Sequence, residues 1–259
     1  MKKLLKISAV IFVIGAILLG IGIAMRGFKP FSIAFKNGKV NIEDGQQYTF
    51  VQEKTEIDSF TNIDINTNVS EIRIIPSDSY AIEYSTDSSN FDYEVKNDSL
   101  VVTSTGEAVN ISVNFTSKKD YLYIYVPSDC QLNDITITSS VGDIDINSQT
   151  CESLSIDLGV GDININNSNF SSVNIDSDTG DVEGSSVTIS SDLTIQNDVG
   201  DTEISLTAGN YNIDLETDCG DITVNGNDVD DGVSQSFHES NNGASISISA
   251  NTGDIEVNY

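Results

Sequence analysis

The sequence is short of positive charge. Its 259 residues hold 12 Lys and Arg against 40 Asp and Glu, which gives a formal net charge of −28. Five of the basic residues fall within positions 1–29, and none follows Lys119. Because binding to nucleic-acid phosphates needs a basic face, this balance excludes nucleic acid as a partner. The C-terminal half has no Lys or Arg of its own for salt bridges, so it must fold through burial and backbone hydrogen bonds.

Residue types that carry catalysis and bind metals are also scarce. The one histidine, His238, lies in a polar stretch and is interpreted as a solvated loop residue. Nucleophile–base pairs and zinc sites need several clustered His or Cys side chains, which this sequence does not offer. We therefore assign no catalytic residue and no cofactor, and expect a protein that is not an enzyme. An enzyme acting on wall polysaccharides is a weaker alternative, because residues 120–259 lack the Lys or Arg that an acidic sugar would need.

Three cysteines are too few for a disulfide scaffold. Cys130 and Cys151 would lie on neighbouring turns, so a disulfide between them stays open. Cys219 stands where equivalent positions hold Val or Thr, and we expect it to be a small core residue.

Only one long hydrophobic run is present, at residues 7–25, and it contains no charge. A helix of that length spans roughly 28 Å, close to the hydrocarbon core of a bilayer. The basic segment 1–6 in front of it favours a cytoplasmic N-terminus. We expect a single-pass anchor in the cell membrane with an extracellular C-terminal domain, joined by a juxtamembrane linker at 26–50. A cleaved signal peptide is the alternative.

The sequence is rich in one internal repeat, a Gly-Asp pair that returns at separations of 19, 19, 20, 20 and 33 residues. Apolar residues stand eight, six and two positions before each aspartate, and one and three positions after it. The step from two before the aspartate to one after it is three residues, whereas side chains on one face of a strand recur every two. This predicts two alternating strands with a phase shift at Gly-Asp. Glycine would form the corner and aspartate would cap it. The corner glycines are Gly142, Gly161, Gly180, Gly200, Gly220 and Gly253.

A period of about twenty residues with two strands per repeat fits one coil of a β-solenoid. We therefore predict an all-β, single-stranded β-solenoid over residues 51–259, with its regular coils at 130–259. A worn coil stands upstream, where Ser70-Glu71 replaces Gly-Asp between the isoleucines of "NIDINTNVSEIRII". The interval of 33 residues between the last two Gly-Asp pairs contains an insertion at 225–245, which should loop out from a coil edge.

Aromatic residues concentrate between the worn coil and the regular coils, at 80–127. Several short alternating runs there read as strands, and Asn97-Asp98 is typical of a hairpin turn. We expect antiparallel strands that cover one end of the solenoid, because an open coil edge invites pairing with another chain.

Stacking in register would bring the repeat aspartates into one acidic ladder. Calcium prefers several oxygen ligands and is a possible occupant. The repeat is not the Gly-rich nonapeptide of calcium-binding β-rolls, so a structural role in the corner is favoured and no metal ligand is assigned. The ladder comprises Asp143, Asp162, Asp181, Asp201 and Asp221, and whether Asp254 joins it stays open.

Four features together resemble bacterial β-strand-repeat proteins grouped as candidate adhesins, a domain class of unknown function. They are the membrane segment, the worn coil, the L-x-I-x-V-P strand ending at Pro127, and Gly-Asp units every twenty residues. The resemblance covers roughly residues 55–259 and implies no catalytic motif. Ser70-Glu71 and Gly184 depart from the pattern, which indicates weaker packing there.

Two functions follow as hypotheses. The leading one is a non-enzymatic, membrane-anchored module that displays an interaction surface to an envelope or surface ligand. The alternative is a regulatory component of a cell-envelope stress-response system that acts on a membrane protein partner. The resemblance allows this second hypothesis, because some Gram-positive relatives lie beside such systems.

Overall fold

The computed structural model describes residues 31–36, 39–44, 50–69, 71–86, 91–104, 110–113, 120–229 and 234–259. These residues form strands and turns and contain no helix. Accordingly, no membrane-spanning helix is found within this part of the chain. The expected anchor at 7–25 lies outside the described residues. The chain divides into two compact units: 1–48 with 107–118, and 49–106 with 119–259.

The first unit contains a three-stranded sheet in the order β2-β1-β9, and both pairings are antiparallel. Its strands are β1 (Phe31–Lys36), β2 (Lys39–Asp44) and β9 (Asn110–Val113). The sequence interpretation gave the first two to a linker and the third to the cap. Here β1 pairs with both β2 and β9.

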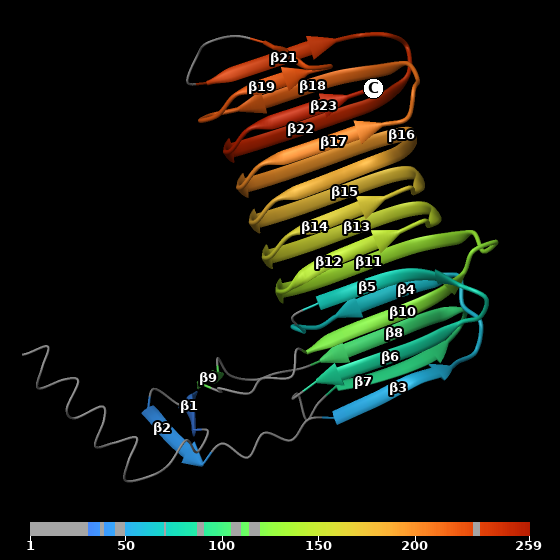
Figure 1. The fold of residues 1–259 in the computed structure, drawn as a ribbon, viewed down its shortest axis with the longest axis vertical. Coiled ribbons are helices and arrows are strands. Elements are labelled where there is room, and N and C mark those ends of the chain that lie inside the picture. The colour runs from blue at the N-terminus through green and yellow to red at the C-terminus, as the bar shows by residue number, and fades with distance from the viewer. Residues whose placement is uncertain are drawn as a thin grey trace, which may run out of the picture. The chain divides into compact units, whose positions relative to one another are not determined.

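The second unit is a stack of coils (Figure 1). Each regular coil has a longer strand on one face and a shorter strand on the other. The longer strands pair in parallel with their counterparts in the next coil, and so do the shorter ones, which confirms the predicted in-register stacking. The strands are β11 (Leu132–Val141), β12 (Asp143–Asn147), β13 (Thr150–Val160), β14 (Ile163–Asn166), β15 (Asn169–Thr179), β16 (Val182–Val199) and β17 (Thr202–Leu206).

The worn coil belongs to the same stack. Its strands β4 (Asn62–Asn66) and β5 (Glu71–Ser77) pair in parallel with β11 and β12. Ile63, Ile65 and Ile72 are fully buried, so the apolar register survives without the Gly-Asp motif.

The cap region differs from the prediction. The strands concerned are β3 (Phe50–Glu56), β6 (Ala81–Thr86), β7 (Phe91–Lys96), β8 (Ser99–Ser104) and β10 (Tyr121–Pro127). β7 and β8 form the expected hairpin, with Asn97 and Asp98 at φ 51° and 62°. However, β8 pairs in parallel with β4, and β10 pairs in parallel with β5. Two distant segments therefore continue the stack, and only β3, β6 and β7 add antiparallel strands outside it.

The C-terminal end departs from sequence order. The remaining strands are β18 (Tyr211–Thr217), β19 (Ile222–Val224), β20 (Asn227–Asp228), β21 (Gln235–Glu239), β22 (Ala244–Thr252) and β23 (Ile255–Asn258). β22 pairs in parallel with both β16 and β18, and β23 with both β17 and β19. The last coil of the chain is thus inserted beneath the one before it. The insertion does not simply loop out: β21 runs antiparallel to β18, and His238 is an exposed residue of this strand rather than of a loop.

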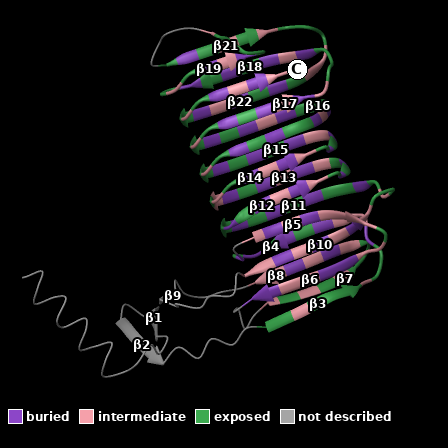
Figure 2. Cartoon of the chain, viewed as in Figure 1, coloured by how far each residue is buried: buried purple, intermediate pink, exposed green. Residues whose placement is uncertain are grey.

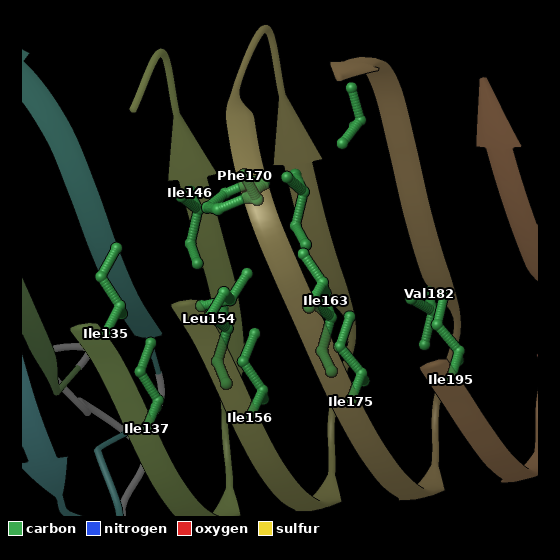
Figure 3. Close-up of a cluster of buried hydrophobic side chains, with 14 of the residues drawn as sticks. Ile135, Ile137, Ile146, Leu154, Ile156, Ile163, Phe170, Ile175, Val182 and Ile195 are labelled. Atoms are coloured by element: carbon green, nitrogen blue, oxygen red, sulfur yellow. The ribbon is translucent and has the colours of Figure 1, made fainter. Parts of the chain in front are cut away.

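The core repeats from coil to coil (Figures 2 and 3). At the positions eight and six residues before each aspartate, and one and three after it, every side chain is buried, as predicted. Figure 3 shows part of this array, in which Ile135, Leu154 and their equivalents recur on successive coils. The gap left by Gly184 is filled by Ile204 and Val187.

One predicted core column is wrong. The residues two before each aspartate face outward: Val141, Val160 and Val199 are 55%, 49% and 49% exposed, and Cys219 is also exposed. The buried residues are instead those four before the aspartate, such as Ser139 and Asn197. The phase shift therefore falls on the two outward residues before glycine rather than at Gly-Asp.

Candidate functional site

The corner glycines are required by both conformation and space. Gly180 has a φ of 140°, and a Cβ atom there would lie 1.9 Å from the carbonyl oxygen of Gly161 in the neighbouring coil. Gly161, Gly200 and Gly253 repeat the same backbone conformation and close approach. Any side chain would push adjacent coils apart, so glycine at this place is a condition of stacking.

The buried polar residues before the corner bind its carbonyl oxygens. Asn197 Nδ2 donates to the carbonyl oxygens of Gly180 and Gly200, both at 3.1 Å. Thr217 Oγ1 donates to the carbonyl of Gly253 at 3.0 Å. These bonds satisfy backbone acceptors that lie inside the corner.

The repeat aspartates lie in one column and link the coils. Each carboxylate accepts a hydrogen bond from the backbone N–H of the aspartate in the next coil, with N···Oδ1 distances from 2.8 to 3.2 Å. The prediction had each aspartate cap its own corner, whereas the observed bond joins two coils. Because the last coil is inserted, the column runs in the order Asp143, Asp162, Asp181, Asp201, Asp254 and Asp221.

The end of this column is closed by a side chain that the sequence analysis missed. Gln235 Nε2 donates to Asp221 Oδ1 at 3.1 Å, and Gln235 Oε1 accepts from the Ile222 N–H at 2.7 Å. For the coil below, the backbone of Asp221 makes the same two bonds. Its N–H donates to Asp254 Oδ1, and its carbonyl oxygen accepts from the Ile255 N–H. The buried Gln235 amide thus replaces the backbone of a missing next coil.

The column does not form a metal centre of recognisable geometry. Across the described residues, no group of three or more His, Cys, Asp or Glu side chains is arranged to hold a metal ion. One oxygen of each linking carboxylate is already engaged by a backbone N–H. The geometry therefore gives the aspartates a structural role.

The cysteines are free thiols, so the Cys130–Cys151 disulfide left open by the sequence is not formed. Cys130 Sγ lies 3.1 Å from the hydroxyl of Tyr80. Burial raises the pKa of the Cys151 thiol to about 12, which leaves it protonated at neutral pH. Cys151 is therefore not an activated nucleophile.

A different cluster stands out on the short-strand face, at the cap end of the stack. Tyr121, Tyr123 and Tyr125 alternate along β10 with core residues, so their half-buried rings share the outer surface. They lie between β6 on one side and β5 on the other. We call the surface formed by these three tyrosines with Lys54, Glu71, Arg73, Glu83 and Asp145 the tyrosine face.

Carboxylates on the flanking strands hold the tyrosine hydroxyls. Tyr121 donates to Glu83 Oε1 at 3.2 Å and Tyr125 to Glu83 Oε2 at 2.8 Å. Tyr123 donates in the opposite direction, to Glu71 Oε2 at 3.1 Å. All three rings are therefore fixed by bonds to neighbouring strands.

Two cations complete the tyrosine face. Lys54 Nζ lies 3.7 Å from the ring centroid of Tyr125, and the Arg73 guanidinium lies 5.5 Å from that of Tyr123. Arg73 also pairs with Glu71, and its Nε lies 3.1 Å from Asp145 Oδ2. The charges of this surface are thus largely matched among themselves.

The tyrosines of this face remain neutral at physiological pH. Burial, followed by the hydrogen bond to Glu83, raises the pKa of Tyr125 to about 12, and the same causes raise the pKa of Tyr121. Burial also raises the pKa of Asp145, against the opposing effect of Arg73. The surface therefore offers uncharged rings surrounded by fixed donors and acceptors.

Sequence reasoning placed these aromatic residues in a cap but did not identify them as a surface. The signal was present in the alternation of "YLYIYV", which puts every tyrosine on one side of a strand. The partners from β3, β5, β6 and β12 lie far apart in sequence, and only the strand pairing brings them together.

No curated protein matches the sequence. A crystal structure of a candidate cell adhesion protein from Clostridium sporogenes is 17% identical over 82% of this chain and 98% of that one, with a TM-score of 0.47. A candidate adhesin from Bacteroides fragilis is 16% identical over 83% of this chain and 98% of that one, with a TM-score of 0.35. A family profile described as Toastrack DUF4097 matches residues 60–257, and the chain therefore belongs to this family.

Proposed function

We propose that the protein is a non-enzymatic, membrane-anchored extracellular module that binds a component of the cell envelope through the tyrosine face. The observation that carries this proposal is the set of three half-buried rings on one face of the stack, each held by a hydrogen bond to a carboxylate. Tyrosine is enriched at binding surfaces because it offers a large apolar area at a low cost in conformational entropy.

The absence of enzymatic activity is supported by the placement of the rare reactive groups. His238 is exposed on the outermost strand β21. Cys151 is buried and protonated. Residues 7–25 would supply the membrane anchor and place the stack outside the cell.

The proposal is tested with the full-length protein in detergent micelles, captured on purified envelopes of the source bacterium. We expect the double variant Tyr121→Leu/Tyr123→Leu to bind at least about tenfold more weakly, as loss of central aromatic contacts generally does. Tyr259→Leu is the matched control, because Tyr259 is also half-buried and donates to a glutamate, Glu239, at the other end of the stack. Equal capture of both variants would contradict the proposal.

A second double variant tests whether any loss of binding comes from misfolding. Tyr121→Phe/Tyr123→Phe keeps the rings and removes only the hydroxyls, and its thermal midpoint is compared with that of the leucine variant. If binding fails only in the leucine variant while both unfold at similar temperatures, the ring surface carries the interaction.

A further inference from the structure

We infer that the ligand of the tyrosine face is an uncharged glycan chain. This inference rests on the proposed function, and it adds the chemical class of the ligand. Three properties of the tyrosine face carry it: the ring arrangement, the local charge balance and the supply of hydrogen-bonding groups.

The rings form a rigid apolar platform. Tyr121 and Tyr123 stack with their centroids 4.5 Å apart and their planes at 28°. The hydroxyl bonds to Glu83 and Glu71 hold them in place before any ligand arrives. A ligand that contacts these rings therefore loses little free energy in ordering them.

The charge balance separates the tyrosine face from the rest of the stack. Two cations, Lys54 and Arg73, offset three carboxylates here. Further along the same face, paired strands bring Glu183, Glu203 and Glu256 into one column, beside the column of repeat aspartates. No Lys or Arg follows position 119, so these columns have none nearby in their own half of the chain.

This distribution discriminates among ligand classes. A polyanion is repelled by the net charge of −28. A polycation finds more carboxylates along the glutamate and aspartate columns than at the tyrosine face, and would spread over the stack. An uncharged ligand gains nothing from the columns and is directed to the rings.

Hydrogen-bonding groups around the rings suit hydroxyl-rich ligands. The Arg73 guanidinium presents several donors, and the carboxylates of Glu71, Glu83 and Asp145, which already bond to the tyrosines or to Arg73, keep further lone pairs as acceptors. A sugar hydroxyl both donates and accepts, so it can bond to this mixed set without bringing a charge. Apolar rings and mixed polar groups thus occur together on one surface.

The test uses the full-length protein and two uncharged probes, chitohexaose and cellohexaose, with hexalysine as the cationic comparison. Each probe is titrated by calorimetry and then used to compete with envelope capture. We expect at least one neutral oligosaccharide to bind and to compete, and Tyr121→Leu/Tyr123→Leu to weaken it about tenfold or more. The control Tyr259→Leu should stay within about twofold of the unchanged protein.

The outcomes separate this inference from the proposed function. If envelope capture depends on the tyrosines but neither oligosaccharide binds or competes, the glycan assignment is overturned and the proposed function stands. If only hexalysine competes with envelope capture, the glycan assignment is also overturned, and the ligand is a cationic protein segment. If envelope capture is indifferent to the tyrosine variants, the proposed function fails as well.

Discussion

The regular coils at 132–259 and the N-terminal strands at 50–127, which comprise the worn coil and the cap, share one stack but are held together differently. The coils contain no Lys or Arg and join through backbone pairing, apolar columns and the aspartate links. The N-terminal strands add tyrosine–carboxylate bonds, cation–π contacts and the ion pairs of Arg73, one of which reaches Asp145 in the first regular coil.

This difference indicates which part of a repeat protein can form a surface of mixed aromatic and charged side chains. Many columns of the regular coils place the same residue type directly above and below, as the aspartate column does, and each side chain must tolerate that neighbour. Small β-branched residues, Ser, Asn and hydrogen-bonded Asp meet that condition. The N-terminal strands, including those of the worn coil, depart from this repetition, and Lys54, Arg73 and Glu83 form a mixed surface there.

The largest expected effect comes from breaking the corner on which the regular coils depend. Gly180→Ala should lower the free energy of unfolding by more than about 3 kcal/mol, because a strained φ adds to a clash with backbone. The added Cβ would lie 1.9 Å from the carbonyl oxygen of Gly161. Urea unfolding followed by circular dichroism measures the loss.

The matched control for this substitution is Gly226→Ala. Gly226 also has a positive φ, 71°, but no heavy atom outside its chain neighbours lies within 4 Å of the position of its Cβ. It should cost only about 1–2 kcal/mol. Equal losses at the two positions would show that close stacking of the corners does not matter.

A smaller effect is expected at the end of the regular coils. Gln235→Ala leaves the Ile222 N–H and the Asp221 carboxylate without the amide that closes the column, at a cost of about 1–3 kcal/mol. The loss should be local, so hydrogen exchange at the Ile222 amide should accelerate more than exchange in β12. The exposed Gln196→Ala serves as the control. If the hydrogen-exchange rate of the Ile222 amide is unchanged in Gln235→Ala, Gln235 does not cap the column.

Much of the stack was predictable because its columns repeat. Ile63 and Ile72 revealed a coil without its motif, since the apolar spacing alone defines the register. The outward valines misled the prediction: Val160 looks like a core residue, while the truly buried positions hold polar residues such as Asn197. Those polar residues are tolerated inside because they bind the corner carbonyls.

The order of the last coils could not be read from the sequence. Asp201 can be followed by Asp221 or by Asp254, since Ile213 and Ile246 offer the same apolar column to the coil below. The structure chooses the second, and Asp254 donates its N–H to Asp201. The partners of the three tyrosines could likewise not be read from the sequence, because they meet only through non-sequential strand pairing.

The smallest expected effect concerns calcium and the aspartate column. Because one oxygen of each linking carboxylate accepts a backbone N–H, we expect the thermal midpoint of the full-length protein to be unchanged by millimolar calcium. Differential scanning calorimetry with calcium, and with magnesium as the control, measures this. A rise specific to calcium would mean that the column binds the ion.

The central claim is that the aspartate column is structural and that the tyrosine face binds the ligand. The most direct test of this claim replaces five aspartates together. The variant carries Asn at positions 143, 162, 181, 201 and 254, which keeps an oxygen acceptor and removes the mutual repulsion of about 1 kcal/mol per neighbouring pair. Capture on envelopes and the thermal midpoint are measured for this variant and for Tyr121→Leu/Tyr123→Leu. We expect the asparagine variant to bind normally and to melt no lower than the unchanged protein, while the tyrosine variant loses binding. Loss of binding in a folded asparagine variant, with binding retained in the tyrosine variant, would contradict the account.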